Sequence, residues 1–278
     1  FWLGSDKEIG NLYPRENSRM AYEGRRREGE EEIVSLTRCA WAGSQRYGAL
    51  VWTGDIASNF ESLRNQVANA LNMGIAGMPW WTTDIGGFHE GNTEDPVFRE
   101  CLVRWFQFAT FCPVLRMHGF REPKVVEAGH KFKMGDAGSW KYTSGSPNEL
   151  WSFGDEVYEI LTYYLRIREQ IRPYVNELME EAHNKGTPLM RPMFYDYPEQ
   201  KKMWDMEDQY LFGADMVVAP VLYSGCGSRQ IYLPEGEWCD IHTGEVFQGG
   251  NTYTADTPIQ IIPVYVRKER YQGLFPLQ

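Results

Sequence analysis

Several patterns that would define a protein class are absent from this sequence. The five cysteines are odd in number and show no C-x-x-C spacing, and the five histidines are scattered without an H-E-x-x-H motif. A disulfide framework and a zinc site are therefore not expected, and we predict buried free thiols, no metal and no cofactor. No apolar run is long enough to span a membrane, so we predict no membrane partner. The compartment is left open, with a slight preference for the cytoplasm.

Positive charge is also scarce. The chain has 28 lysines and arginines against 38 acidic residues, a formal net charge of −10, which argues against a nucleic-acid partner and fits a neutral small-molecule substrate. The one basic run, Arg25 to Arg27, is followed at once by glutamates, so we interpret it as a solvated helix end. With 42% hydrophobic and 14% aromatic residues, the 278-residue chain can bury a substantial core.

Residues 14–188 alternate short β-rich runs with helical runs, which is typical of βα units around a parallel sheet or barrel. The first helix expected covers residues 58–74. It begins with a capping box formed by Ser58 and Glu61 and ends at Gly74. Four strands are expected, within residues 31–41, 47–55, 75–84 and 112–119.

Two further helices complete this region. Asp95 and Pro96 are placed to cap and start a helix that runs to residue 111. After a long polar loop over residues 121–149, a single helix is expected from near Asp155 to Gly186. Insertions of that length usually carry function.

Beyond Pro188 the pattern changes to short β-prone stretches separated by glycine and proline. We therefore expect a domain boundary near residue 190, with residues 1–189 in the βα region and residues 190–278 in a small antiparallel β-sandwich domain. A closed (β/α)8 barrel needs eight strands and only four are counted, so the fold class expected is α/β, the C-terminal half of a TIM barrel followed by that β-domain. The N-terminal part of the same barrel is an expected partner.

Polar residues stand at the carboxyl end of each expected strand, where a (β/α) barrel places its active site. Charged hydrogen-bonding groups next to aromatic rings suit the hydroxyls and C–H faces of a sugar. The polar residues are Arg38, Asp55, Asp84 and His118, and the interleaved aromatic residues are Trp41, Trp52, Trp80, Trp81 and Phe88.

Each of these residues also has a plainer interpretation. Asp55 and Asp84 could be turn-stabilising residues, and Arg38 could form a structural ion pair with either of them. A lone His118 is more often a satisfied buried histidine than a catalytic group, and aromatic residues more often belong to the core. The placement of all four polar groups at corresponding strand ends favours a site.

Four segments resemble glycoside hydrolase family 31, which contains α-glucosidases, α-xylosidases and some transglycosylases. They are LTRCAWAGSQRYGALVWTGD, GMPWWTTDIGGF and CPVLRMHG in the βα region, and EDQYLFGADMVVAPV in the β-domain. The resemblance implies that Asp55, in the W-x-G-D motif, is the catalytic acid/base. It also implies that Arg38, Asp84 and His118, supported by Arg116, hold the sugar ring. Together with the aromatic residues Trp52, Trp81 and Phe88, they make up the expected substrate-binding set.

The family's nucleophile, an aspartate in a W-x-D-x-x-E motif, has no counterpart at the start of the chain. The nearest segment has Gly4 where the aspartate would be and Lys7 where the glutamate would be. A nucleophile upstream of this chain is preferred over one lost at Gly4, and over Asp6 or Glu8 as substitutes. The fragment alone is therefore expected to be inactive.

Three functions are carried forward. The resemblance implies a retaining α-glycosidase that hydrolyses terminal α-glucosyl or α-xylosyl residues by double displacement, with an oligosaccharide or α-glycoside as substrate. The alternatives are a transglycosylase of the same family and a non-catalytic carbohydrate-binding protein that lacks the nucleophile. The sugar and the oligomeric state are left open.

Overall fold

The computed structural model describes residues 2–121 and 146–276, so most of the polar loop expected at 121–149 lies outside the described residues. None of the helices in these ranges combines the length and apolar character that a membrane span requires. The βα region contains, in chain order, α1 (Asp6–Ile9), α2 (Leu12–Arg27), β1 (Ser35–Thr37), the 3-10 helix η1 (Ser44–Tyr47), β2 (Ala49–Trp52), α3 (Phe60–Ile75), β3 (Trp81–Thr82), α4 (Pro96–Thr110), the 3-10 helix η2 (Leu150–Phe153), α5 (Asp155–Gln170) and α6 (Arg172–Lys185).

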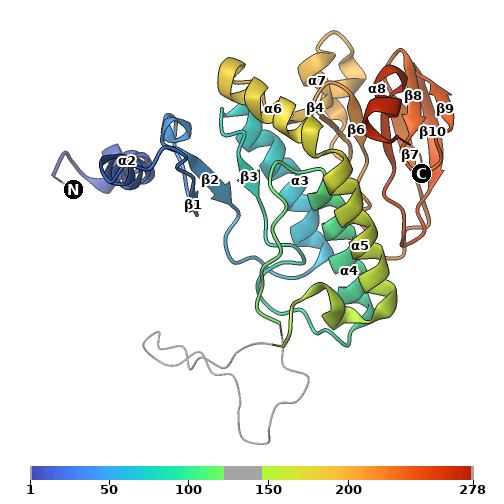
Figure 1. The fold of residues 1–278 in the computed structure, drawn as a ribbon, viewed down its shortest axis with the longest axis horizontal. Coiled ribbons are helices and arrows are strands. Elements are labelled where there is room, and N and C mark those ends of the chain that lie inside the picture. Colours follow the sequence, from blue (N-terminus) through green and yellow to red (C-terminus); the bar gives the residue numbers. More distant parts are fainter. Residues whose placement is uncertain (1, 122–145, 277–278) are drawn as a thin grey trace, which may run out of the picture.

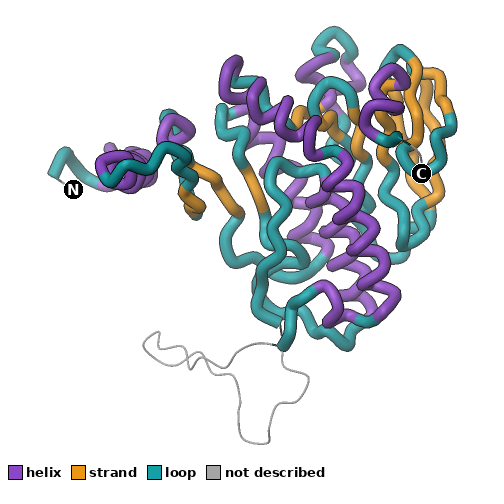
Figure 2. The backbone as a smooth tube through the Cα atoms, in the orientation of Figure 1, coloured by secondary structure: helices purple, strands orange, loops and turns teal. Residues whose placement is uncertain are grey.

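The β-domain follows and is mostly β-structure (Figures 1 and 2). Its elements are β4 (Met190–Pro192), α7 (Met193–Asp196), the 3-10 helix η3 (Lys201–Asp205), β5 (Tyr210–Phe212), β6 (Met216–Val218), β7 (Ser228–Leu233), β8 (Glu237–Asp240), β9 (Val246–Gln248), β10 (Asn251–Asp256), β11 (Val264–Arg267) and α8 (Lys268–Leu274). Six strands form one antiparallel sheet in the order β4-β5-β6-β11-β8-β9, and β10 pairs with β7 in a second.

Strands β1, β2 and β3 form a parallel sheet in that order, with α3 after β2 and α4 after β3. The strand expected over residues 112–119 is not formed. That segment contacts the end of β3 through single bonds, from Thr82 Oγ1 to the Val114 carbonyl at 2.9 Å and from Ile85 N–H to the Arg116 carbonyl at 3.3 Å. Pro113 lacks the N–H that a ladder needs, which is one reason the pairing stays incomplete.

Helix α3 begins and ends differently from the sequence expectation. Its N-cap is Asn59, whose side chain accepts from Ser62 N–H at 2.8 Å, so the capping box on Ser58 is wrong. Gly74 lies inside the helix. A Cβ at Gly74 would come within 2.9 Å of Pro188 Cβ, so the glycine is needed where α3 approaches the segment leading into β4.

Of the other two helix expectations, one is confirmed and one is wrong. Asp95 caps α4 as expected, and its side chain accepts from Val97 N–H at 2.9 Å. The single helix expected over residues 155–186 is instead two, α5 and α6, separated at Ile171. Pro173, near the start of α6, cannot donate the backbone bond that a continuous helix would need there.

The cysteine expectation is partly wrong. Cys101, Cys112 and Cys239 are buried, whereas Cys39 is exposed and Cys226 is half-buried, and all five are free thiols. Cys39 lies in the segment just after β1, where the described chain gives it no covering layer. The run Arg25 to Arg27 forms the exposed last turn of α2, as expected.

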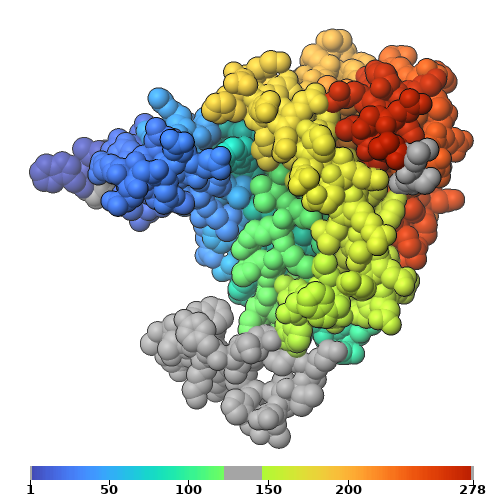
Figure 3. All heavy atoms as spheres, viewed as in Figure 1, coloured from blue at the N-terminus to red at the C-terminus, as the bar shows by residue number. Residues whose placement is uncertain are grey.

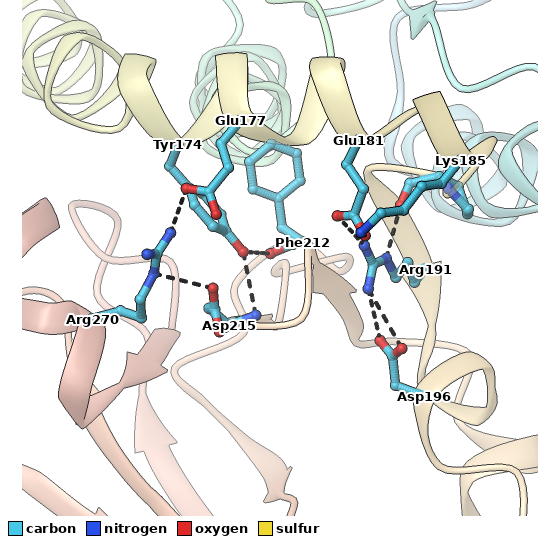
Figure 4. Close-up of polar contacts among 10 residues, drawn as sticks. Tyr174, Glu177, Glu181, Lys185, Arg191, Asp196, Phe212, Asp215 and Arg270 are labelled. Atoms are coloured by element: carbon cyan, nitrogen blue, oxygen red, sulfur yellow. Dashed lines mark hydrogen bonds and ion pairs between the residues drawn. The ribbon is translucent and has the colours of Figure 1, made fainter. Parts of the chain in front are cut away.

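A shared interface joins α6 to the β-domain (Figure 4). The Tyr174 hydroxyl donates to the Phe212 carbonyl at 3.0 Å and accepts from Asp215 N–H at 3.2 Å. Arg270 bridges Glu177 at 2.6 Å and Asp215 at 3.2 Å. One apolar core cluster contains residues of α3 to α6 and of five β-domain strands, so the two regions pack as one body.

The N-terminal segment contrasts with this packed body. Helices α1 and α2 extend away from the rest of the chain as an arm, seen in dark blue in Figure 3. Large apolar side chains on the arm and on the adjoining β1 segment face solvent, among them Trp2 (99% exposed), Met20 (68%), Leu36 (43%) and Trp41 (48%).

Candidate active site

The loops that follow β1 and β2 bring Arg38 and Asp55 together. Arg38 Nη2 lies 2.6 Å from Asp55 Oδ2, and its guanidinium lies 5.3 Å from the centre of the Trp52 ring. Gly54, with a φ of +78°, makes the turn that places Asp55 beyond the strand end. Thr53 Oγ1 lies 3.2 Å from Thr83 Oγ1, which aligns the ends of β2 and β3.

Asp84 and Arg116 form a second ion pair beside the first. The Asp84 side chain is fully buried, and its Oδ1 accepts from Arg116 Nη1. Its Oδ2 has no hydrogen-bond partner among the described residues, and neither does Trp52 Nε1. The Arg116 guanidinium lies 5.9 Å from the Trp52 ring centre, so one indole ring contacts the guanidinium groups of both ion pairs.

His118 and Phe88 complete the cluster. Their ring centres are 5.5 Å apart, and His118 is exposed in the described chain. Desolvation lowers the pKa of His118 below its ordinary value, the positive charge of Arg116 lowers it further, and the charge of Asp55 acts in the opposite direction. The imidazole is therefore neutral near pH 7 and can both donate and accept a hydrogen bond.

Trp81 lies apart from these residues. Its side chain is 1% exposed and packs edge-on against Phe108, with ring centres 6.4 Å apart, inside the main core. The structure therefore gives no open ring face at Trp81 for a sugar, and Trp81 is left out of the substrate-binding set proposed below. Successive strand residues point to opposite faces, so one of the neighbouring Trp80 and Trp81 had to face the core.

The arrangement offers carboxylate, guanidinium, imidazole and aromatic groups on one rim. Among the described residues no group of three or more histidines, cysteines, aspartates or glutamates could hold a metal ion. A pocket of about 590 Å³ lies elsewhere, between α4, the start of α5 and the β-domain, and contains none of the cluster residues.

Comparison with known proteins gives matches along almost the whole chain. Residues 3–178 match the glycosyl hydrolases family 31 TIM-barrel domain, and residues 186–270 match the glycosyl hydrolase family 31 C-terminal domain. These matches confirm the expected fold class, the later part of a TIM barrel followed by a β-domain.

Two curated relatives and one solved structure illustrate the similarity. An alpha-xylosidase of Saccharolobus solfataricus is 36% identical over 95% of this chain and 33% of its own length. An uncharacterized family 31 glucosidase of Pseudescherichia vulneris is 65% identical over 45% of this chain and 24% of its own. The crystal structure of an alpha-xylosidase from a soil metagenome, complexed with xylose, is 50% identical with a TM-score of 0.91, over 98% of this chain and 40% of its own.

The chain thus spans a third or less of the length of these two curated relatives. The first family match, over residues 3–178, includes the strand-end residues of the cluster, which are Arg38, Asp55, Asp84 and His118. The second match covers most of the β-domain. The chain belongs to glycoside hydrolase family 31.

Proposed function

We propose that this chain is the C-terminal part of the catalytic region of a retaining α-glycosidase, with Asp55 as its acid/base. The observation that carries the proposal is the pairing of Arg38 with Asp55 on the rim that also holds Asp84, Phe88 and His118. An ion pair this exposed contributes only about 0–1 kcal/mol to stability, so stability alone is a weak reason for it.

The proposed reaction is a double displacement. A carboxylate from the preceding part of the protein attacks the anomeric carbon while Asp55 donates its proton to the leaving oxygen, and Asp55 then activates the water that releases the sugar. The two carboxyl groups of a retaining enzyme lie about 5–5.5 Å apart, so the nucleophile must enter the space beside Asp55. The 33% exposure of the Asp55 side chain leaves that space open.

The remaining residues hold the sugar. Arg38 and His118 reach the rim with free hydrogen-bonding capacity, and the buried Asp84 has one oxygen without a partner among the described residues. Phe88 and Trp52 offer ring surfaces for C–H contacts. The relatives named above are xylosidases and a glucosidase, which supports a terminal α-xylosyl or α-glucosyl residue as substrate.

We also propose that the preceding part of the barrel covers the exposed side of β1 and the apolar residues of the N-terminal arm. An uncovered edge strand and exposed large apolar side chains are unusual in a complete domain. The division into residues 1–189 and 190–278 stays part of this proposal, with the boundary between the end of α6 at Lys185 and β4 at Met190. Finding a W-x-D-x-x-E motif upstream would identify the nucleophile.

The test uses the full-length protein. Replacing Asp55 by Ala should lower hydrolysis of natural α-xylosides and α-glucosides by about 10²–10⁴-fold, because a positioned general acid contributes that much. Azide should partly restore the activity of Asp55→Ala on an activated substrate, whose leaving group needs no proton. Comparing the rates of the wild-type protein on α-xylosides and α-glucosides gives its sugar specificity. Product analysis with an acceptor sugar present separates hydrolysis from transfer.

Asp95→Ala is the matched control, since Asp95 caps α4 and lies outside the cluster. It should cost some stability and leave activity per folded molecule unchanged. Wild-type activity in Asp55→Ala would contradict the assignment of Asp55.

A further inference from the structure

Arg121 is a fully buried arginine outside the cluster described above. Its Nη2 donates to the Ile85 carbonyl at 2.9 Å, its Nη1 to the Gly87 carbonyl at 2.9 Å and to Ser58 Oγ at 3.1 Å. Its Nε donates to Asn148 Oδ1 at 2.8 Å. One guanidinium therefore joins three segments that are far apart in the sequence.

The segments joined by Arg121 belong to the rim of the candidate site. Residues 85–87 form the turn between Asp84 and Phe88, and Ser58 stands three residues after Asp55. Backbone bonds complete the connection, since Phe88 N–H donates to the Ile56 carbonyl at 2.8 Å and Phe120 N–H donates to the Phe88 carbonyl at 2.9 Å. Displacing Arg121 would free the turn that carries the side chains of Asp84 and Phe88.

The space around Arg121 is made by glycines. A Cβ at Gly86 would lie 2.9 Å from Arg121 Nη2, one at Gly91 3.1 Å from Nη1, and one at Gly119 2.8 Å from Nη2. The guanidinium also lies 5.0 Å from the centre of the Phe98 ring. This close fit leaves the guanidinium little room to move.

The charge of Arg121 strengthens these bonds. Burial lowers the pKa of Arg121 to about 10, so the group stays protonated at neutral pH. Hydrogen bonds from a charged donor are stronger than neutral ones, and here the acceptors are carbonyl, hydroxyl and amide oxygens. Burying a cation is costly unless its donors are bonded, so moving the turn away from Arg121 would leave a buried charge without acceptors.

We propose that Arg121 is a positioning residue of the candidate active site, whose buried guanidinium fixes the turn over residues 85–87 and with it the side chains of Asp84 and Phe88. This inference rests on the proposed function of the site. It adds a residue that touches no sugar and acts through the groups that do.

The test compares Arg121→Lys with Arg104→Lys in the full-length protein. Arg104 is the matched control because it is also a buried arginine bound to carbonyl oxygens, those of Thr257 at 2.6 Å and Ile261 at 2.8 Å, but at the β-domain interface. Lysine keeps the charge and loses the planar set of donors. Both substitutions should lower the thermal midpoint.

Only Arg121→Lys should also lower kcat/KM per folded molecule, by about 100-fold, since a small misplacement of binding groups has an effect of that size. Its KM should rise as sugar contacts weaken. The Gly87 amide donates to the Asp84 carbonyl within the turn, and the Phe88 amide donates to the Ile56 carbonyl. Hydrogen exchange at both amides should become faster in Arg121→Lys and stay at the wild-type rate in Arg104→Lys.

Two results would overturn the proposal. One is wild-type kcat/KM together with wild-type exchange in Arg121→Lys. The other is a loss of activity in both variants in proportion to their loss of stability. If Arg121→Lys does not fold, Ser58→Ala decides, because it removes one acceptor of Nη1 and should speed the same exchange. If the full-length wild-type protein has no glycosidase activity, the proposed function fails, but the role of Arg121 does not fail with it. Hydrogen exchange at the Gly87 and Phe88 amides would then decide whether Arg121 fixes the turn.

Discussion

Asp84 combines full burial with a formal charge that one neighbour compensates. Its Oδ1 is bound by Arg116, whereas the Asp55 side chain at the neighbouring strand end is 33% exposed. Taking a carboxylate out of water is costly unless a cation and hydrogen bonds accompany it. The stability of the fold should therefore depend on the Asp84–Arg116 pair, which also belongs to the candidate site.

Replacing Arg116 by Met tests this dependence. It leaves the buried carboxylate without its cation and should lower the free energy of unfolding by about 3–5 kcal/mol, the range for breaking a buried pair. Denaturant unfolding of the full-length protein measures it. Arg116→Lys, which keeps the charge, should lose clearly less, and an equal loss in the two variants would argue against an electrostatic cause.

The individual site residues differ in how far the sequence predicts them. Arg38 and Asp55 could be predicted as neighbours because parallel strands end at one edge. The core position of Trp81 could not, since alternation places one of two adjacent tryptophans inward without saying which. The role of Arg121 was missed because its partners are backbone carbonyls, which leave no residue-type pattern. The surrounding glycines were the available signal.

At the scale of elements, α5 and the turn after β8 meet at His242. The His242 Nε2–H donates to the Ile262 carbonyl at 2.9 Å, and the Tyr163 hydroxyl lies 3.0 Å from Nδ1, where it can donate to a neutral ring. Burial lowers the pKa of His242 below its ordinary value of 6.5, against the opposing effects of the Ile262 carbonyl and the Asp240 charge. A second proton would turn Nδ1 into a donor and remove the bond from Tyr163.

A loss of stability in mild acid follows from this lowered pKa. The unfolded chain takes up the proton first, so the contribution of His242 is complete above pH 6.5 and is lost as the pH falls toward the lower pKa of the folded state. Urea unfolding of the full-length protein across this range should show a shallower pH dependence in His242→Gln than in wild type. His183→Gln, at an exposed position on α6, is the control, and equal slopes in all three proteins would contradict the prediction.

Element types were easier to predict than element ends. The sequence predicted a helix over residues 58–74, and α3 forms there, but its N-cap is Asn59 and not Ser58. Both residues are good N-caps, and Ser58 Oγ instead accepts from Arg121. Gly74 looked like a helix end and is instead a close-packing position against Pro188. That role depends on a residue more than a hundred positions away, which local sequence patterns do not contain.

At the scale of the whole molecule, the N-terminal arm and the β1 edge set the behaviour of the isolated chain. Produced alone, it should self-associate or unfold without a single cooperative transition, because its large exposed apolar side chains lack a covering layer. Size-exclusion chromatography and scanning calorimetry, with the full-length protein as control, measure both properties. A monomer with one cooperative transition would contradict the proposed missing barrel half.

The contacts between α4 and the β-domain also set an order of events during synthesis. Arg104 in α4 binds the carbonyl of Ile261, a residue 157 positions later. At roughly 5–20 residues per second, a ribosome takes about 8–30 s to add that stretch. During this interval α4 carries a guanidinium without its final acceptors, beside an apolar face still open to solvent. The newly made helix α4 therefore passes through a period of exposure that ends only when the last strands of the β-domain emerge.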